Sequence, residues 1–341
     1  MSSPSLQPIA LTNFLRDALT AGGFSLGNAE IVSTHLVDAE MKGVPSHGVN
    51  RLGLYLGEAE REVIDPKAIP VIKKVKDGLL SVDGSRGIGI VAMKKATDAA
   101  IEMAEANGIA AVGITQCGHT GRMGAYAEQA ANAGFLAVSF GGGGRRLWGN
   151  VVPFGGKDPV MSTNPYTLGM PGLEDDPVVC DFAISSWPAG KVAVAKANGD
   201  QLPENIIITK DGKPSTDPED FYNGGALLPA AGTKGSGLGI IAELMGGAML
   251  GAAIEYNWLL ILIRVDAFRT MQEYQGAAKE FVNEVRESTP VNPDEKVILP
   301  GERETTLARK AKADGIVISD GVWQAIKEAA TKTGIKAEDY F

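Results

Sequence analysis

A serine and a histidine at positions 46 and 47 form the first candidate for chemistry in this sequence. Imidazole suits proton transfer near neutral pH, and a neighbouring hydroxyl can orient the ring. Arg51 is close enough in sequence to reach the same pocket, where its guanidinium could hold a carboxylate in a bidentate grip. A Ser-His turn that only caps the next helix explains the same residues equally well.

A second candidate is the loop from Gly118 to Gly124, which contains His119 and follows a predicted strand over 109–115. Its glycines permit close backbone approach, and the helix that follows offers free N–H groups to a phosphate. The spacing G-x-x-G-x-x-G differs from the G-x-G-x-x-G dinucleotide fingerprint, and such a loop is often only a turn. The next predicted strand, 135–140, ends in four glycines and two arginines over 141–146. Two such loops at one edge of a sheet favour a phosphate-bearing ligand.

Three further residues are candidates for a functional or a structural role. Lys234 lies in a glycine-rich loop over 231–237, before an apolar helix, where it could bind a phosphate or simply allow tight packing. Asp181 ends a short strand and could accept hydrogen bonds from a ribose or cap a helix. His35 lies on the apolar face of its helix, which is typical of a structural histidine.

The composition excludes several classes of protein. The formal net charge of −9 argues against a general nucleic-acid binder. No His, Cys and Asp cluster has metal-ligand spacing, so we expect no metal, and Cys117 and Cys180 form no disulfide framework. The longest apolar run, 258–263, is far too short to span a membrane, and the N-terminus shows no secretory signal. We therefore expect a cytoplasmic protein without a membrane partner.

The elements that must position these residues form an α/β pattern. Helical periodicity dominates the first 60 residues, and short strands begin after Pro66. The segments 109–115 and 135–140, with a helix between them, predict a parallel strand pair with a right-handed crossover. An apolar helix over 238–250, a buried strand over 259–265 and a helical tail complete the chain.

These motifs, in this order, resemble the type 2 malate/L-lactate dehydrogenase family along nearly the whole chain. The segments that carry the resemblance are Ser46-His47-Gly48-Val49-Asn50-Arg51, Gly118-His119-Thr120-Gly121-Arg122, Val152-Pro153-Phe154-Gly155-Gly156, Ser162-Thr163-Asn164-Pro165, Asp181-Phe182-Ala183, Gly190-Lys191, Leu228-Pro229, Lys234-Gly235 and Pro300-Gly301-Glu302.

The resemblance implies an α/β, non-Rossmann NAD(P)-binding fold, with a cofactor domain inserted between helical N- and C-terminal segments. We expect residues 1–75 and 255–341 to form the helical domain for substrate binding and dimerisation, and residues 76–254 to bind NAD or NADP. The activity implied is the interconversion of a small 2-hydroxy acid and its 2-oxo acid in a homodimer. Reduction of a cyclic imino acid is the alternative enzyme activity, and a non-catalytic nucleotide-binding protein is the alternative class.

Residue roles carry over by position. The resemblance implies that Ser46, His47 and His119 are catalytic and that Arg51 and Thr163 bind substrate. The cofactor contacts that it implies are His119, Thr120, Gly121, Arg122, Gly143, Gly144, Asp181, Phe182, Ala183, Lys234, Gly301 and Glu302. Some imine-reducing members have an aspartate where this chain has Lys191, which weighs against the imine alternative.

Overall fold

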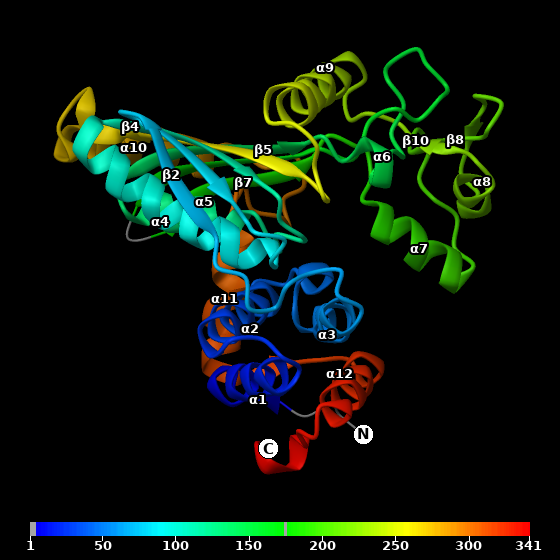
Figure 1. Ribbon diagram of the computed structural model, residues 1–341. Coiled ribbons are helices and arrows are strands. Elements are labelled where there is room, and N and C mark those ends of the chain that lie inside the picture. Colours follow the sequence, from blue (N-terminus) through cyan, green and yellow to red (C-terminus); the bar gives the residue numbers. More distant parts are fainter. Residues whose placement is uncertain (1–4, 174–175) are drawn as a thin grey trace.

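Helices from both ends of the chain form a helical body, seen at the bottom of Figure 1. The computed structural model describes residues 5–173 and 176–341. The short strands β1 (Ser5–Leu6) and β12 (Ile316–Val317) pair antiparallel and so join the two ends. The helices of this body are α1 (Pro8–Ala21), α2 (Leu26–Met41), α3 (Leu52–Glu60), α11 (Glu302–Asp314) and α12 (Asp320–Lys332), with short 3-10 turns η1 (Pro45–His47), η2 (Val49–Arg51) and η5 (Ala337–Asp339).

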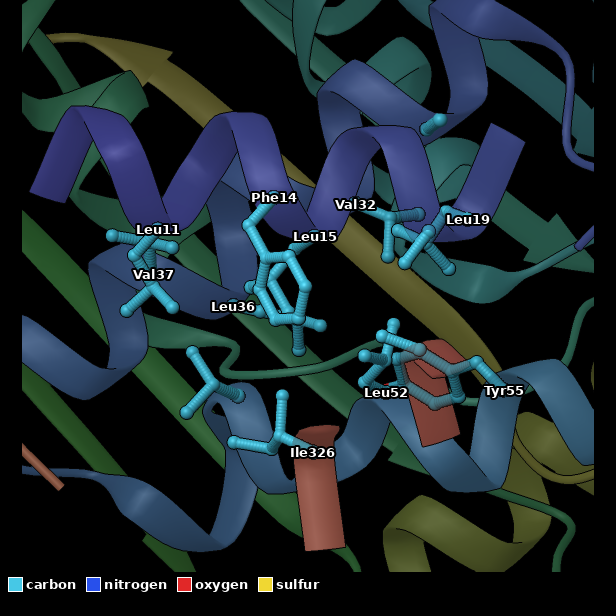
Figure 2. Close-up of a cluster of buried hydrophobic side chains, with 14 of the residues drawn as sticks. Leu11, Phe14, Leu15, Leu19, Val32, Leu36, Val37, Leu52, Tyr55 and Ile326 are labelled. Carbon is cyan, nitrogen blue, oxygen red and sulfur yellow. The ribbon is translucent and has the colours of Figure 1, made fainter. Parts of the chain in front are cut away.

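The core of the helical body forms because α1 and α2 turn apolar faces toward each other. Phe14 and Leu15 of α1 and Leu36 of α2 are fully buried, and Figure 2 shows them side by side. Leu52 and Tyr55 place one face of α3 in the same cluster. The helical body therefore has a hydrophobic core of its own, on which α3 is fixed.

A seven-stranded mixed sheet forms the second body, with the strand order β2-β3-β4-β11-β5-β6-β7. Only β3 and β4 pair in parallel, and all other neighbours are antiparallel. The strands are β2 (Val71–Lys76), β3 (Leu79–Asp83), β4 (Ile109–Thr115), β5 (Phe135–Gly142), β6 (Pro165–Leu173), β7 (Asp176–Ala183) and β11 (Asn257–Arg264).

The prediction that strands 109–115 and 135–140 pair directly is wrong. The late strand β11 lies between them and is antiparallel to both. The reason is that β11 is apolar on both faces of the sheet. Trp258, Leu260 and Leu262 are buried on one face, and Leu259, Ile261 and Ile263 are partly buried on the other. A strand that is apolar on both sides is stable only in the middle of a sheet.

Helices α4 (Gly89–Asn107) and α5 (Gly124–Asn132) cover one face of the sheet (Figure 1). Alanines at positions 92, 96, 100 and 104 of α4 are fully buried and allow this helix to approach the strands closely. The opposite face is only partly covered. The helix α10 (Met271–Glu287), which follows the turn η4 (Val265–Ala267), contacts β6 and donates a hydrogen bond from the Tyr274 hydroxyl to the Pro171 carbonyl (2.6 Å).

A smaller lobe extends from the end of the sheet, at the right of Figure 1. It contains a three-stranded sheet in the order β10-β8-β9 and is joined to the large sheet by α9. The elements are α6 (Arg145–Trp148), α7 (Ala189–Asn198), β8 (Ile207–Ile208), β9 (Pro214–Ser215), α8 (Pro218–Tyr222), β10 (Ala226–Leu227), α9 (Thr233–Glu243) and its π-helical continuation η3 (Leu244–Met249).

The predicted domain boundaries do not coincide with the edges of the large sheet. Residues 71–75 of β2 and all of β11 belong to the sheet, although both segments are assigned above to the helical domain. The functional division of the chain into a substrate domain and a cofactor domain stays a prediction.

The core between α1 and α2 supplies the first test. We expect Leu36→Ala to lower the free energy of unfolding by about 2–5 kcal/mol, because Leu36 is fully buried and its truncation leaves a cavity. Leu26→Ala on the same helix is the control, since Leu26 is 56% exposed and should change stability by less than about 0.5 kcal/mol. Denaturant titrations of the two variants measure the difference, and equal losses would contradict the core described here.

Candidate active site

His47 and His119 meet between the helical body and the sheet. Their rings are stacked, with centroids 5.4 Å apart and planes 21° from parallel. His47 ends the turn η1 in the helical body, whereas His119 comes from the loop after β4. The structure therefore brings together the two histidines that the sequence analysis selected, although 72 positions separate them in the chain.

A glycine permits the sharp backbone path that presents His47. A Cβ atom at Gly48 would lie 2.1 Å from a carboxylate oxygen of Glu40. That same oxygen accepts a hydrogen bond from the Val49 N–H (3.1 Å) at the start of η2. Glu40 thus holds the backbone between His47 and Arg51, and burial raises the pKa of this carboxyl.

The loop that carries His119 is fixed against α2. The Arg122 N–H donates to Nε2 of His35 (2.8 Å), and a Cβ at Gly121, where φ is +69°, would lie 2.2 Å from the same nitrogen. The His35 ring also stacks on Tyr126 (5.4 Å), and burial lowers the pKa of His35 to about 3. His35 is a structural histidine, as its helical position predicts.

His119 is held in one neutral form. Its Nδ1 accepts a hydrogen bond from the Gly121 N–H (3.3 Å) and lies 2.7 Å from the Tyr55 hydroxyl. A backbone N–H can only donate, so Nδ1 is the acceptor and the ring hydrogen resides on Nε2. Burial, followed by the positive electrostatic influence of His47 and Arg51, lowers the pKa of His119 to about 3. Near neutral pH this ring is an uncharged hydrogen-bond donor.

His47 has a more adaptable partner. Its Nδ1 lies 2.9 Å from the Ser46 hydroxyl, which can either donate or accept. Burial and the nearby charge of Arg51 lower the pKa of His47 to about 4. Arg51 donates from Nε to the Ser46 carbonyl (2.6 Å) and forms no ion pair within residues 5–173 and 176–341. Its two terminal nitrogens are therefore available to an anion.

Arg122 joins the helical body to the sheet through ion pairs. Its guanidinium is 5% exposed and forms ion pairs with Asp38 of α2 (3.0 Å) and Glu128 of α5 (2.7 Å). Lys42 of α2 pairs with the same two carboxylates. The Arg122 side chain is occupied by these ion pairs, so only its backbone is left for the predicted cofactor contact. The neighbouring Thr120 is buried as well.

The glycine run at the end of β5 is required by packing. A Cβ at Gly142 would lie 1.9 Å from the Ala242 carbonyl, one at Gly143 would lie 2.8 Å from the Gly246 backbone, and one at Gly144 would lie 2.5 Å from the Glu255 carbonyl. The strand end thus packs directly on the π-helical segment η3. This packing explains the glycines without a phosphate, and cofactor contact at Gly143 and Gly144 stays a prediction.

A half-buried carboxylate that the sequence analysis missed links this strand end to the Ser162 loop. Glu243 accepts hydrogen bonds from the Gly143 N–H (3.0 Å), the Ser162 N–H (3.1 Å) and the Asn164 side chain (3.0 Å). Thr163, predicted to bind substrate, lies in the same loop, with its hydroxyl 3.4 Å from that of Tyr256. A single acid in the apolar segment 238–250 is the sequence signal that could have indicated Glu243.

The remaining predicted cofactor residues lie along β7 and its continuation. The Asp181 carboxylate accepts hydrogen bonds from the Gly124 N–H (2.7 Å) and the Thr167 hydroxyl (2.9 Å), so it caps α5. Phe182, 37% exposed, stacks on Tyr166, and Ala183 pairs with Pro165. The strand continues to the loop of Lys234, because the Ala230 N–H donates to the Ile184 carbonyl (2.7 Å).

Lys234 and Glu302 differ in what surrounds them. Lys234 is exposed near the start of α9 and has no ion-pair partner in the described part of the chain. Glu302 begins α11 next to Gly301, where it pairs with Arg286 (3.3 Å) and accepts from the Leu299 N–H (2.9 Å). Gly301 itself lies against Val179 of β7. Lys234 is thus the freer of the two charged groups.

Lys191, where some imine-reducing members have an aspartate, places its ammonium 4.9 Å above the ring of Trp187.

Within residues 5–173 and 176–341, no three His, Cys, Asp or Glu side chains are grouped as metal ligands. The same ranges contain no helix with the length and apolarity needed to cross a membrane.

Comparisons with known proteins agree with this architecture. A family model described as malate/L-lactate dehydrogenase matches residues 6–327. The chain is 31% identical to an L-sulfolactate dehydrogenase of Methanocaldococcus jannaschii over 98% of this chain and 99% of that protein. It is also 31% identical to hydroxycarboxylate dehydrogenase B of Escherichia coli O157:H7, over 96% of this chain and 94% of the relative.

Solved structures show the same fold. The sulfolactate dehydrogenase of M. jannaschii matches with a TM-score of 0.89 and 29% identity, covering 99% of each chain. A delta1-piperideine-2-carboxylate reductase of Pseudomonas syringae matches with a TM-score of 0.87 and 27% identity, covering 96% of this chain and 100% of that one. These likenesses confirm the fold that the order of motifs predicted.

The hydrogen bonds of His119 give a prediction that needs no substrate. We expect its ring to remain neutral from pH 8 down to pH 5, because its pKa of about 3 lies below that whole range, and to carry its hydrogen on Nε2. Nitrogen-15 NMR of labelled histidine distinguishes the two tautomers and the charged form, and His119→Gln assigns the signal among the three histidines. Titration near the ordinary value of about 6.5, or a hydrogen on Nδ1, would contradict this assignment.

Proposed function

The chain belongs to the malate/L-lactate dehydrogenase family, and on that basis we propose that His47, His119 and Arg51 form the active site of its reaction. That reaction is the NAD(P)-dependent interconversion of a 2-hydroxy acid and a 2-oxo acid. The observation that carries the assignment is the stacked pair His47–His119 beside an arginine without an ion-pair partner among the described residues. A proton-exchanging group and a carboxylate anchor are the two protein groups that this chemistry needs.

We assign different tasks to the two histidines. His119 is fixed as a neutral donor, so its Nε2–H can hydrogen-bond to the substrate oxygen at C2 and stabilise the negative charge that develops there. His47 exchanges the proton, since the Ser46 hydroxyl can follow a change in its protonation. Arg51 is one of the charges that lower the pKa of His47. A bound carboxylate compensates that charge, so substrate binding moves the pKa of His47 back toward its ordinary value.

A cation and an aromatic face on connected segments fit a dinucleotide. Exposed Lys234 provides a cation for a phosphate, and Phe182 provides a partly exposed aromatic face, on segments connected through Ile184 and Ala230. When bound, the nicotinamide supplies or accepts the hydride at C2 of the substrate. Arg145 and Arg146 are exposed and suit the 2′-phosphate of NADP, so we propose that NADP as well as NAD is accepted.

We further infer that the chain forms a homodimer. The sheet face opposite α4 and α5 carries exposed Leu79, Ile109 and Leu168, and α9 with η3 exposes Ile241 and Leu244 (55% each). One chain thus carries both an uncovered apolar sheet face and an apolar helix. A second copy related by a twofold axis can cover both.

The measured mass in solution tests the dimer. Light scattering should give about twice 35.7 kDa for the wild type, and Ile241→Glu should shift the protein toward the single-chain mass. Leu26→Glu on α2 is the matched control, because Leu26 is 56% exposed and lies on the helical body, outside both apolar surfaces. A wild-type mass of one chain at micromolar concentration would contradict the dimer.

The reaction is tested through Arg51. We expect the wild type to reduce pyruvate with NADH or NADPH, and we expect Arg51→Met to lower kcat/KM about 10- to 100-fold through KM. Loss of one charge-assisted pair costs about 1.5–3 kcal/mol. Coenzyme affinity, read from nicotinamide fluorescence, should stay within about twofold. Arg269→Met, which removes an exposed arginine after η4, is the control. An unchanged KM in Arg51→Met would place the carboxylate anchor elsewhere.

A further inference from the structure

One face of α3 points into the site and carries an acid beyond the residues already assigned. Arg51 caps this helix, and Tyr55 and Glu58 follow at four and seven positions, so all three share one helical face. The hydrogen bond from Tyr55 to His119 shows that this face is directed at the histidine pair. Glu58 therefore lies on the same helical face as the substrate anchor, about one helical turn beyond Tyr55.

Among the described residues, the Glu58 carboxyl has no hydrogen-bond or ion-pair partner that explains its position. Its Oε2 atom is buried without a hydrogen bond, and the side chain forms no ion pair within the described ranges. Burial raises the pKa of Glu58, although the charges of Arg61 and Arg51 oppose this effect. An acid left unpaired near a substrate anchor is expensive for folding, which suggests a role in the site.

A second acid, Glu255, reaches the same place from the loop before β11. This loop is held to the His119 loop, since the Gln116 side chain donates to the Ala252 carbonyl (3.0 Å). It is also held to the end of β5, because Gly144 lies against the Glu255 carbonyl. The half-buried Glu255 carboxyl interacts electrostatically with both Glu58 and Arg51.

We propose that Glu58 and Glu255 form an acidic wall of the substrate site that selects 2-oxo and 2-hydroxy acids bearing a single carboxylate and rejects those with a second anionic group. The inference rests on the proposed function, because it takes Arg51 as the anchor for the carboxylate at C1. That carboxylate neutralises Arg51, the positive charge that faces both acids. A second anion in a small substrate then meets two carboxylates in a partly desolvated pocket, where repulsion is strong.

The selection depends on pH. Burial, reinforced by the charge of Glu58, raises the pKa of Glu255 to about 7. Above pH 7 Glu255 is charged and repels a second anion, whereas below pH 7 it gains a proton and the repulsion weakens. The titratable groups that face this carboxyl from the surrounding elements are Arg51, Tyr55, Glu58, Cys117 and Tyr256. Burial raises the pKa values of Tyr55, Cys117 and Tyr256, so these three stay uncharged between pH 6 and 8.

The experiment compares kcat/KM for pyruvate, for oxaloacetate and for the 4-methyl ester of oxaloacetate, with NADH and NADPH. The ester has nearly the length of oxaloacetate but only one charge, so it separates size from charge. At pH 8 we expect the wild type to prefer the ester over oxaloacetate by roughly tenfold or more. This ratio should fall several-fold at pH 6. Glu255→Gln and Glu58→Gln should each lower the ratio at pH 8, and Glu60→Gln, an exposed acid on the same helix, should leave it unchanged.

Each outcome decides the proposal. A wild type that uses oxaloacetate as well as its ester at pH 8, or the same ratio in Glu255→Gln as in the wild type, would overturn the acidic wall. The wild-type ratios at two pH values need no variant, so they decide the matter even if Glu58→Gln fails to fold. Failure of the proposed function looks different: a folded wild type would then reduce none of the three compounds with either coenzyme.

Discussion

The contact between α2 and the loop around His119 determines where every part of the site can lie. Arg122 is central to it: the backbone N–H binds His35, and the guanidinium is shared between Asp38 and Glu128. Breaking a buried ion pair by removing one partner leaves a buried charge and typically costs about 3–5 kcal/mol. The helical body and the sheet are therefore joined by polar groups that tolerate little displacement, beside a hydrophobic core on each side.

This junction explains how a stable stacked pair can form from residues of two bodies. His47 is positioned by Glu40 and Ser46 within the helical body, and His119 by Tyr55 and the Gly121 N–H. Tyr55 links the two, because its ring belongs to the helical core (Figure 2), while its hydroxyl donates to Nδ1 of His119 in the sheet-side loop. The chemistry of the pair thus depends on packing that is far more extensive than the site.

Residues with a distinctive type and neighbourhood could be predicted from the sequence, and residues defined by distant contacts could not. Ser46-His47, Arg51 and the His119 loop carry local patterns, and the structure brings them together. Glu58 and Glu255 carry no distinctive local pattern, Glu243 is marked only by its apolar segment, and the residues that surround all three in the fold are not evident from the sequence. The glycines after β5 resemble a phosphate loop in the sequence, which does not reveal that η3 packs on them. The position of β11 was missed for the same reason, since its pairing partners lie more than 100 residues away.

The place of β11 in the sheet also has a consequence for biosynthesis. A growing chain contains β4 and β5 long before it contains their shared neighbour, and each of them then has an open edge and an apolar surface. The ribosome must add more than a hundred residues after β5 before the gap can be filled. The large sheet therefore closes only after most of the chain has emerged, and the half-made protein is the state most exposed to aggregation and most dependent on chaperones.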